Sequence, residues 1–314
     1  MTTLSDWLAA QTVDPELASV VATMAASSVE IAEVLRTAPI AGQTGLAGQT
    51  NVQGEAQKEL DIVSNDIVLK HLRENPAISI LVSEELDEAV HFENQGRYMV
   101  ATDPLDGSSN LDVNVTVGTI FSVLDAGGGL LQKGTAQLAA GYAAYGPATS
   151  LVLTFGTSTA VFTLDAADVW VLTADAVRVP TASAEYAINT ARERFWDAAT
   201  KGYVAENVAG ETGPAGKRHN MRWVGSMVAD IHRILMRGGI FLYPLDSETL
   251  AKGGRLRLLY EANPMALLIE AAAGKSTTGT QRILDVVPTG IHQRVPVILG
   301  SAEEVARVEA WYAK

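Results

Sequence analysis

Two aspartates stand at the end of a short apolar run, in the stretch VATDPLDGSSN at 100–110. Asp103 and Asp106 are followed at once by Gly107, two serines and an asparagine. Crowded carboxylates need cations, and oxygen ligands favour hard ions such as Mg²⁺, Mn²⁺ or Ca²⁺. Glycine lets backbone approach a ligand, and free N–H groups at a helix start bind phosphate. The run therefore predicts a metal site beside an anion-binding turn, as phosphoryl transfer requires.

A second acidic pair, Glu84 and Glu85, directly follows the apolar run SILVS. The runs at 78–83 and 97–102 both have the composition of strands. If these strands are neighbours, their ends bring both acidic pairs to one edge of a sheet. The backbone carbonyl of Leu105 would add an oxygen there. We therefore expect a divalent-cation site at that edge.

Two more carboxylates are candidates for this site: Glu261, which follows LRLLY, and Asp61, near the start of a predicted helix. Each acidic feature alone has an ordinary explanation. An Asp-Gly pair is usually a turn, SEEL is typical of a capped helix start, and Glu261 is an unremarkable surface residue type. Only the combination of strand-end acids with a phosphate-type loop favours the metal site.

Six arginines gather in an otherwise acidic chain: Arg218, Arg222, Arg233, Arg237, Arg255 and Arg257. The last two are separated by one residue in a strand-like run, so they are predicted to lie on the same side. A guanidinium group can donate two parallel hydrogen bonds to a phosphate, which suits a phosphate group of the substrate that is bound but not hydrolysed. Each arginine alone is equally normal as a surface charge, so both explanations stay open.

The composition limits the class of protein. A chain of 314 residues with 47% apolar and 19% charged residues predicts a compact protein of two subdomains. A net charge of −13 argues against nucleic acid and anionic membranes as partners. We recognise neither a membrane-spanning run nor a secretion signal. The absence of cysteine excludes thiol chemistry, and a reducing cytoplasm is the expected location.

Helix and strand patterns are interleaved without strict βαβ order, which favours a layered α+β fold. Helices are predicted at 14–36, 55–73, 225–239 and 263–274, and after Ser301, with Ser301 and Glu304 as a capping box. Strands are predicted at 78–83, 97–102 and 115–124, with several antiparallel strands within 148–179. The segment 38–54, rich in Gly, Thr and Gln, is predicted to be a mobile loop, and the boundary between the halves is placed near Pro180.

Together these stretches resemble class I fructose-1,6-bisphosphatases, of the lithium-sensitive, metal-dependent sugar phosphatase superfamily. DPLDGSSN is shared with relatives such as inositol monophosphatases, whereas VGSMVADIHR and RLLYEANPMA are more specific to the fructose bisphosphatases. The resemblance implies a layered α/β/α/β/α sandwich. Residues 1–180 would form an N-terminal, regulatory-type domain with most metal ligands, and 181–314 a C-terminal sugar-phosphate-binding domain.

The resemblance also implies an activity: Mg²⁺-dependent hydrolysis of the 1-phosphate of fructose 1,6-bisphosphate, in gluconeogenesis or carbon fixation, with Mn²⁺ as a substitute. The matching metal-site positions are Glu84, Glu85, Asp103, the Leu105 carbonyl, Asp106 and Glu261. Asp61 and Glu85 match the positions that activate the attacking water. The matching substrate positions are Asp106, Gly107, Ser108 and Ser109 at the 1-phosphate, and Asn189, Arg222, Tyr243 and Arg255 at the sugar and 6-phosphate. A homotetramer is implied, with Arg222 reaching a neighbouring active site.

The chain departs from the family pattern at the sugar end. Trp223 and Arg192 stand where tyrosines are usual, and Arg255 replaces a lysine. A broader sugar or inositol phosphatase, or sedoheptulose-1,7-bisphosphatase activity, is therefore kept as an alternative. Two other classes are weighed: a catalytically silent sensor of cations and sugar phosphates, which the presence of Asp61 and Glu85 argues against, and a two-carboxylate glycosidase, for which few aromatic residues are available.

The family's AMP-inhibition site has a partial match. Ala18 stands where a hydroxyl is expected, while Glu16, Arg97 and Tyr98 resemble other contacts. The sequence therefore predicts weak or absent inhibition by AMP.

Overall fold

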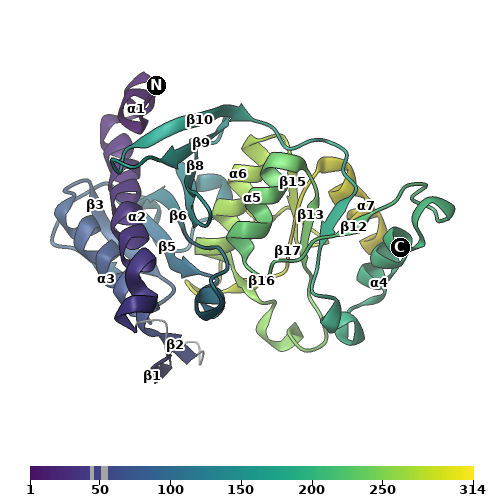
Figure 1. The fold of residues 1–314 in the computed structure, drawn as a ribbon. Helices are drawn as coiled ribbons and strands as arrows, with labels where there is room; N and C mark the ends of the chain where they lie inside the picture. Colours follow the sequence, from purple (N-terminus) through teal and green to yellow (C-terminus); the bar gives the residue numbers. More distant parts are fainter. Residues whose placement is uncertain (43–45, 51–55) are drawn as a thin grey trace.

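The computed structural model describes residues 1–42, 46–50 and 56–314, and these form helices packed against two large sheets (Figure 1). The α-helices are α1 (Leu4–Ala10), α2 (Pro15–Ala41), α3 (Glu59–Glu74), α4 (Ala198–Ala209), α5 (Met227–Arg237), α6 (Asn263–Ala271) and α7 (Ala302–Tyr312). Two small two-stranded sheets are made of β1 (Leu46–Thr50) with β2 (Ala56–Lys58), and β14 (Leu256–Arg257) with β16 (Arg294–Val295).

The larger sheet has eight strands in the order β10-β9-β8-β7-β6-β5-β3-β4. Their bounds are β3 (Ile78–Ser83), β4 (Val90–His91), β5 (Tyr98–Asp106), β6 (Val117–Asp125), β7 (Ala139–Tyr145), β8 (Thr149–Thr154), β9 (Thr159–Leu164) and β10 (Trp170–Val177). Neighbouring strands are antiparallel except β3 and β5, which are parallel. The antiparallel strands predicted within 148–179 are thus confirmed, as is the pairing of the strands that precede the acidic residues.

Helices α2 and α3 cover one face of this sheet (Figure 1). The predicted amphipathic pattern of α2 is confirmed, because Val20, Met24 and Ile31 are fully buried against the sheet. By length and composition α2 could also cross a membrane, but half of its most apolar window is buried in the fold. That burial is typical of a core helix in a soluble protein.

The second sheet has five strands in the order β12-β11-β13-β17-β15. Their bounds are β11 (Glu185–Ala187), β12 (Asn220–Met221), β13 (Ile240–Tyr243), β15 (Lys275–Thr277) and β17 (Val297–Gly300). Helices α5 and α6 lie between the two sheets, where Ile231 and Met265 share a core with Tyr142 of β7. Helices α4 and α7 lie on the outer face, where Tyr203 and Val305 pack against the strands (Figure 1).

Several element boundaries differ from those predicted. Strand β5 does not stop before the aspartates but continues through them to Asp106. Helix α2 extends to Ala41, and 46–50 form a strand, so part of the predicted loop 38–54 is regular structure, while 43–45 and 51–55 lie outside the described residues. The prediction of a capping box formed by Ser301 and Glu304 is wrong. The Ser301 hydroxyl donates to the Pro180 carbonyl, and the Glu304 carboxylate binds Lys217.

Candidate active site

The parallel pairing of β3 and β5 brings the two acidic pairs together. Ser83 lies opposite Thr102 in the register, and the amide of Glu84 donates to the Thr102 carbonyl at 3.1 Å. The chain therefore leaves β3 beside Asp103, as the sequence predicted. Glu84 and Asp103 are 7% and 4% exposed, and Glu85 is half-buried.

The DPLDGSS turn is formed by an irregular strand end. The register between β5 and β6 shifts between Asp103 and Asp106, so the strand bulges there and both carboxylates reach the same edge. Gly107 adopts φ 79°, and a Cβ at this position would lie 3.1 Å from the hydroxyl of Ser226. A glycine is therefore required here. It starts the short 3₁₀-helix Ser108–Val113, as the predicted helix start anticipated.

Glu261 reaches the cluster from the other half of the chain. The strand predicted for LRLLY ends at Arg257, and Glu261 lies in the π-helical turn that follows, Leu258–Ala262. Such turns are rare and frequently occur at functional sites. Carboxylate oxygens of Asp103, Asp106 and Glu261 come within 4.8 Å of one another, and all three residues are buried.

Burial and mutual repulsion govern the protonation of this cluster. Burial, followed by the charges of Glu84, Asp106 and Glu261, raises the pKa of Asp103 well above its usual value. Burial raises the pKa of Asp106 to about 7, although the Val228 amide, which donates to its Oδ2 at 3.0 Å, opposes the shift. Burial also raises the pKa of Glu261. Carboxylates in this state hold protons unless a cation replaces them.

Arg257 is the cation inside the cluster, and the sequence did not predict that place for it. Its Nη2 lies 2.8 Å from Glu84 Oε1, and its amide donates to Glu261 Oε2 at 2.6 Å. The spacing of four residues between Arg257 and Glu261 was the available signal. The side chain is 7% exposed and is held by the carboxylates, although Arg257 and Arg255 line the same cavity.

Asp61 lies at the start of α3, at the mouth of the cluster. Its Oδ2 accepts from the Lys58 amide at 2.8 Å. Its other oxygen, Oδ1, is buried, and the carboxylate also interacts with the Ser108 side chain. Burial raises the pKa of Asp61, and hydrogen bonds from the Lys58 amide and the Ser108 side chain oppose the shift. A buried carboxylate whose pKa is raised is a candidate proton acceptor.

A cavity of about 640 Å³ opens over these residues. The predicted residues that line it are Asp61, Glu84, Glu85, Asp103, Leu105, Asp106, Gly107, Ser108, Ser109, Arg255 and Glu261. Arg257, a candidate in the arginine group, also lines the cavity, and four further lining residues were not predicted: Lys58, Asp112, Lys252 and Arg294. Neither Lys252 nor Arg294 lies in a recognisable motif; Arg294 reaches the cavity because β16 places it opposite Arg257 of β14. We call the carboxylates of Glu84, Asp103, Asp106 and Glu261 the acidic floor of the cavity. The other lining residues include the basic Lys58, Lys252, Arg255 and Arg294.

The predicted sugar-end residues are more dispersed. Tyr243 does not line the cavity, but the centre of its ring lies 5.8 Å from the Arg255 guanidinium carbon. The Trp223 ring packs edge-on against the Tyr243 ring. Asn189 caps a 3₁₀-helix outside the cavity, and its side chain accepts from the Ala191 amide. Arg222 also lies outside, with its guanidinium half-exposed near Glu185. The six arginines therefore do not form one phosphate-binding cluster within the chain.

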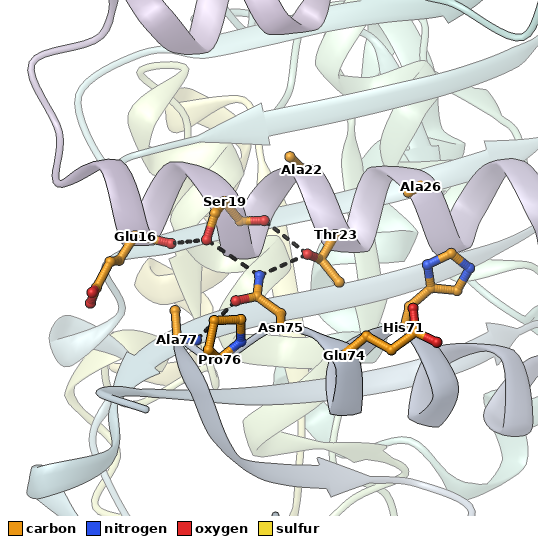
Figure 2. A pocket seen from close by; sticks show the side chains of 10 residues that line it. All are labelled: Glu16, Ser19, Ala22, Thr23, Ala26, His71, Glu74, Asn75, Pro76 and Ala77. Atoms are coloured by element: carbon orange, nitrogen blue, oxygen red, sulfur yellow. Dashed lines mark hydrogen bonds between the residues drawn. The ribbon is translucent and has the colours of Figure 1, made fainter. Parts of the chain in front are cut away.

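A second hollow, of about 610 Å³, lies between α2 and the end of α3 (Figure 2). Its polar side chains bond mainly to one another: Asn75 donates to the hydroxyls of Thr23 and Ser19 at 2.8 and 3.3 Å. Figure 2 shows Glu16 and Glu74 at its edge rather than converging. This hollow has none of the carboxylate crowding seen at the first cavity.

Comparison with known proteins decides the family. The family model for the N-terminal domain of fructose-1,6-bisphosphatase matches residues 5–175, and the model for its C-terminal domain matches 179–313. The chain belongs to the class 1 fructose-1,6-bisphosphatase family. The family is metal-dependent, and this chain has a buried acidic cluster that includes both aspartates of the DPLDGSS turn.

Individual relatives match the chain over nearly all of its length. It is 50% identical over 305 residues to the class 1 fructose-1,6-bisphosphatase of Acinetobacter baumannii, covering 95% of this chain and 94% of that protein. It is 48% identical to that of Hydrogenovibrio crunogenus, with both chains fully covered. The crystal structure of Leishmania major fructose-1,6-bisphosphatase in holo form superposes with a TM-score of 0.95 at 35% identity, covering 100% of this chain and 99% of that one. The fold is thus the mixed α/β fold of this family, with two sheets.

Proposed function

We propose that the chain is a fructose-1,6-bisphosphatase that removes the 1-phosphate of fructose 1,6-bisphosphate in gluconeogenesis or carbon fixation. The observation that carries this is the cluster of Glu84, Asp103, Asp106 and Glu261, buried beside the Gly107 turn in a chain that matches the family end to end. Its fold would be the five-layered α/β/α/β/α sandwich, divided near Pro180 into domains 1–180 and 181–314. We expect it in the cytoplasm.

The donor set fits Mg²⁺, with Mn²⁺ as a substitute. Glu84, Glu85, Asp103, Asp106 and Glu261, with the Leu105 carbonyl, offer only oxygen, which hard divalent cations prefer. The raised pKa values of Asp103 and Glu261 indicate that one buried arginine does not neutralise the cluster. When bound, the metal supplies a Lewis acid that stabilises charge on the phosphoryl oxygens.

The chain's own residues hold the 1-phosphate and move the proton. Asp106, Gly107, Ser108 and Ser109 line the cavity at a 3₁₀-helix start, where backbone and hydroxyl donors face a phosphate. Asp61, a buried carboxylate with a raised pKa, and Glu85 are the proposed acceptors of the proton from the attacking water.

The sugar and 6-phosphate would lie toward Arg255 and Tyr243, with Asn189 beyond them. Arg222 does not line the cavity of its own chain and its side chain is half-exposed, which supports the proposal that it serves the active site of a neighbouring subunit in a homotetramer. Mixing Arg222→Ala and Asp103→Ala chains tests this, because hybrid tetramers would contain sites with both residues intact. Recovery of activity is expected; two inactive parents that stay inactive as verified hybrids would contradict a shared site.

One assay tests the activity itself. Phosphate release from fructose 1,6-bisphosphate is measured with Mg²⁺, with EDTA, and after Mg²⁺ is restored. We expect turnover only with the metal. Sedoheptulose 1,7-bisphosphate and inositol 1-phosphate are run beside it, and a higher kcat/KM for inositol 1-phosphate would favour the broader phosphatase. No turnover of any of the three would favour a silent sensor.

A further inference from the structure

Asp230, on the inner face of α5, is a fully buried carboxylate to which the mechanism above gives no role. Its Oδ2 accepts from the amides of Val224 and Gly225 at 3.1 and 3.2 Å. Its Oδ1 accepts from Arg233 Nη1 at 2.8 Å. The carboxylate thus holds two successive amides of the segment 222–226, which leads from Arg222 into α5. A buried charge used in this way fixes backbone geometry strongly.

The 222–226 segment is fixed at its other edges as well. The Arg222 amide donates to the Tyr186 carbonyl of β11 at 2.8 Å. The Gly225 carbonyl accepts from Asn110 Nδ2 at 3.2 Å, which ties the segment to the DPLDGSSN turn. Gly225 has φ 85°, so this path suits glycine. The segment therefore bridges the second sheet and the phosphate-type turn.

The helix that carries Asp230 also contacts the carboxylate cluster. The Val228 amide, in the first turn of α5, donates to Asp106 Oδ2 at 3.0 Å. Asp230 lies two residues further along the same turn. Any shift of the turn moves both the amide at Asp106 and the backbone of Arg222. Hydrogen bonds to metal-ligating carboxylates typically affect metal affinity by about 10- to 100-fold.

A chain of ion pairs extends the same arrangement to the Arg222 side chain. Arg233 Nε lies 3.4 Å from Glu185 Oε2, and Glu185 Oε1 lies 3.5 Å from Arg222 Nε. Arg233 therefore stands between Asp230 and Glu185, with 16% of its side chain exposed. Asp230 therefore acts on the Arg222 guanidinium by two routes. One is the backbone of the 222–226 segment, and the other is the ion pairs that lead through Arg233 and Glu185.

We propose that Asp230 is a positioning residue that couples the two ends of the substrate site: it sets the place of Arg222 through the 222–226 segment and the orientation of Asp106 through the start of α5. This rests on the proposed function, in which Asp106 is a metal ligand and Arg222 binds substrate. Asp230 itself does not line the cavity, so its proposed effect on the site is indirect.

The test compares Asp230→Asn with Glu270→Gln. Asparagine keeps the size of the side chain but loses the charge that holds Arg233 and the two amides. Glu270 is a matched control, a helix carboxylate bound by Arg282 and Ser276 outside both the cluster and the 222–226 segment. Thermal melting verifies that both variants fold. Mn²⁺ affinity of the metal-free protein is measured by titration, and KM and kcat are measured for fructose 1,6-bisphosphate.

We expect Asp230→Asn to weaken Mn²⁺ binding by about tenfold and to raise KM by about tenfold, with both values within twofold of wild type in Glu270→Gln. A folded Asp230→Asn variant with wild-type Mn²⁺ affinity and KM would overturn the coupling while leaving the enzyme assignment intact. Equal losses in both variants would also overturn it, because the effect would then be general destabilisation. A wild-type chain that neither binds Mn²⁺ nor releases phosphate would instead remove the proposed function, and this inference with it.

Discussion

The guanidinium of Arg257 lies 2.8 Å from the carboxylate of Glu84, although the two residues come from opposite halves of the chain. Both are almost fully buried. This pair joins the end of β3 to the turn that carries Glu261, because the Arg257 amide also holds the Glu261 carboxylate. The acidic floor of the cavity is therefore assembled across the fold, with one cation built in and room for others.

Removing a floor carboxylate is expected to abolish most turnover. Asp103→Ala and Glu84→Gln should each lower kcat by about two orders of magnitude or more, because each deletes a ligand oxygen from the proposed metal site. Steady-state phosphate release at saturating Mg²⁺ measures this, and circular dichroism checks the fold. Asp66→Asn, an exposed position on α3, is the control and should keep full activity. Near-normal kcat in both site variants would remove the metal assignment.

Asp61→Asn is expected to separate proton transfer from metal binding. The amide keeps an acceptor for the Lys58 N–H but is not a base, so kcat should fall by about 10²–10⁴-fold. Mn²⁺ affinity should change little, since Asp61 is not among the proposed ligands. Titration of Mn²⁺ and single-turnover kinetics on the same preparation measure the two effects. A large loss of Mn²⁺ affinity with unchanged single-turnover rate would show that Asp61 acts as a ligand instead.

Protons and divalent cations should compete for the carboxylate floor. The folded metal-free chain holds the Asp106 proton up to a pKa of about 7, whereas an unfolded chain loses it near 3.8. Between these values the native state binds more protons, so the stability of the metal-free chain should fall as pH rises from about 4 to about 7. Excess Mg²⁺ should remove this decline and raise Tm by several degrees at pH 8.

Melting curves from pH 4 to 8, with EDTA or with Mg²⁺, measure this competition. The raised pKa values of Asp103 and Glu261 also make the metal-free chain less stable as the pH rises. A Tm that rises with pH in EDTA, or that ignores Mg²⁺ at pH 8, would contradict the expected linkage.

Inhibition by AMP is expected to be weak or absent. Two residues that resemble AMP contacts are already engaged by Asp14, which accepts from the Tyr98 hydroxyl at 3.0 Å and from Arg97 at 3.3 Å. Burial and Asp14 raise the pKa of Tyr98 to about 12. A nucleotide phosphate would have to displace this carboxylate, and Ala18 offers no hydroxyl in return. An AMP titration measures the effect, and Asp14→Ala with Ala18→Thr should bind AMP more tightly than wild type. Low-micromolar inhibition of wild type would refute the prediction.

Local patterns determined much of this molecule. The burial pattern of α2, the strand at 78–83 and the hairpins after 148 follow from short-range periodicity, which depends only on which side chains leave water. The run DPLDGSS identified its own turn, since the left-handed conformation at Gly107 is a property of that residue type. Crowded acidic residues at strand ends also indicated cations before any fold was known.

Only the tertiary structure decided which cations and acids meet. Arg257 resembles its neighbour Arg255 in sequence, yet Arg257 is buried against Glu84 whereas the Arg255 guanidinium lies beside the Tyr243 ring. Glu304 matches a capping box but instead binds Lys217 and Tyr203. Asp230 looks like one more helix carboxylate until its amide partners are seen. The physical reason is that electrostatic partners far apart in the sequence depend on how sheets and helices are stacked. No local pattern along the chain encodes the distance between two such side chains.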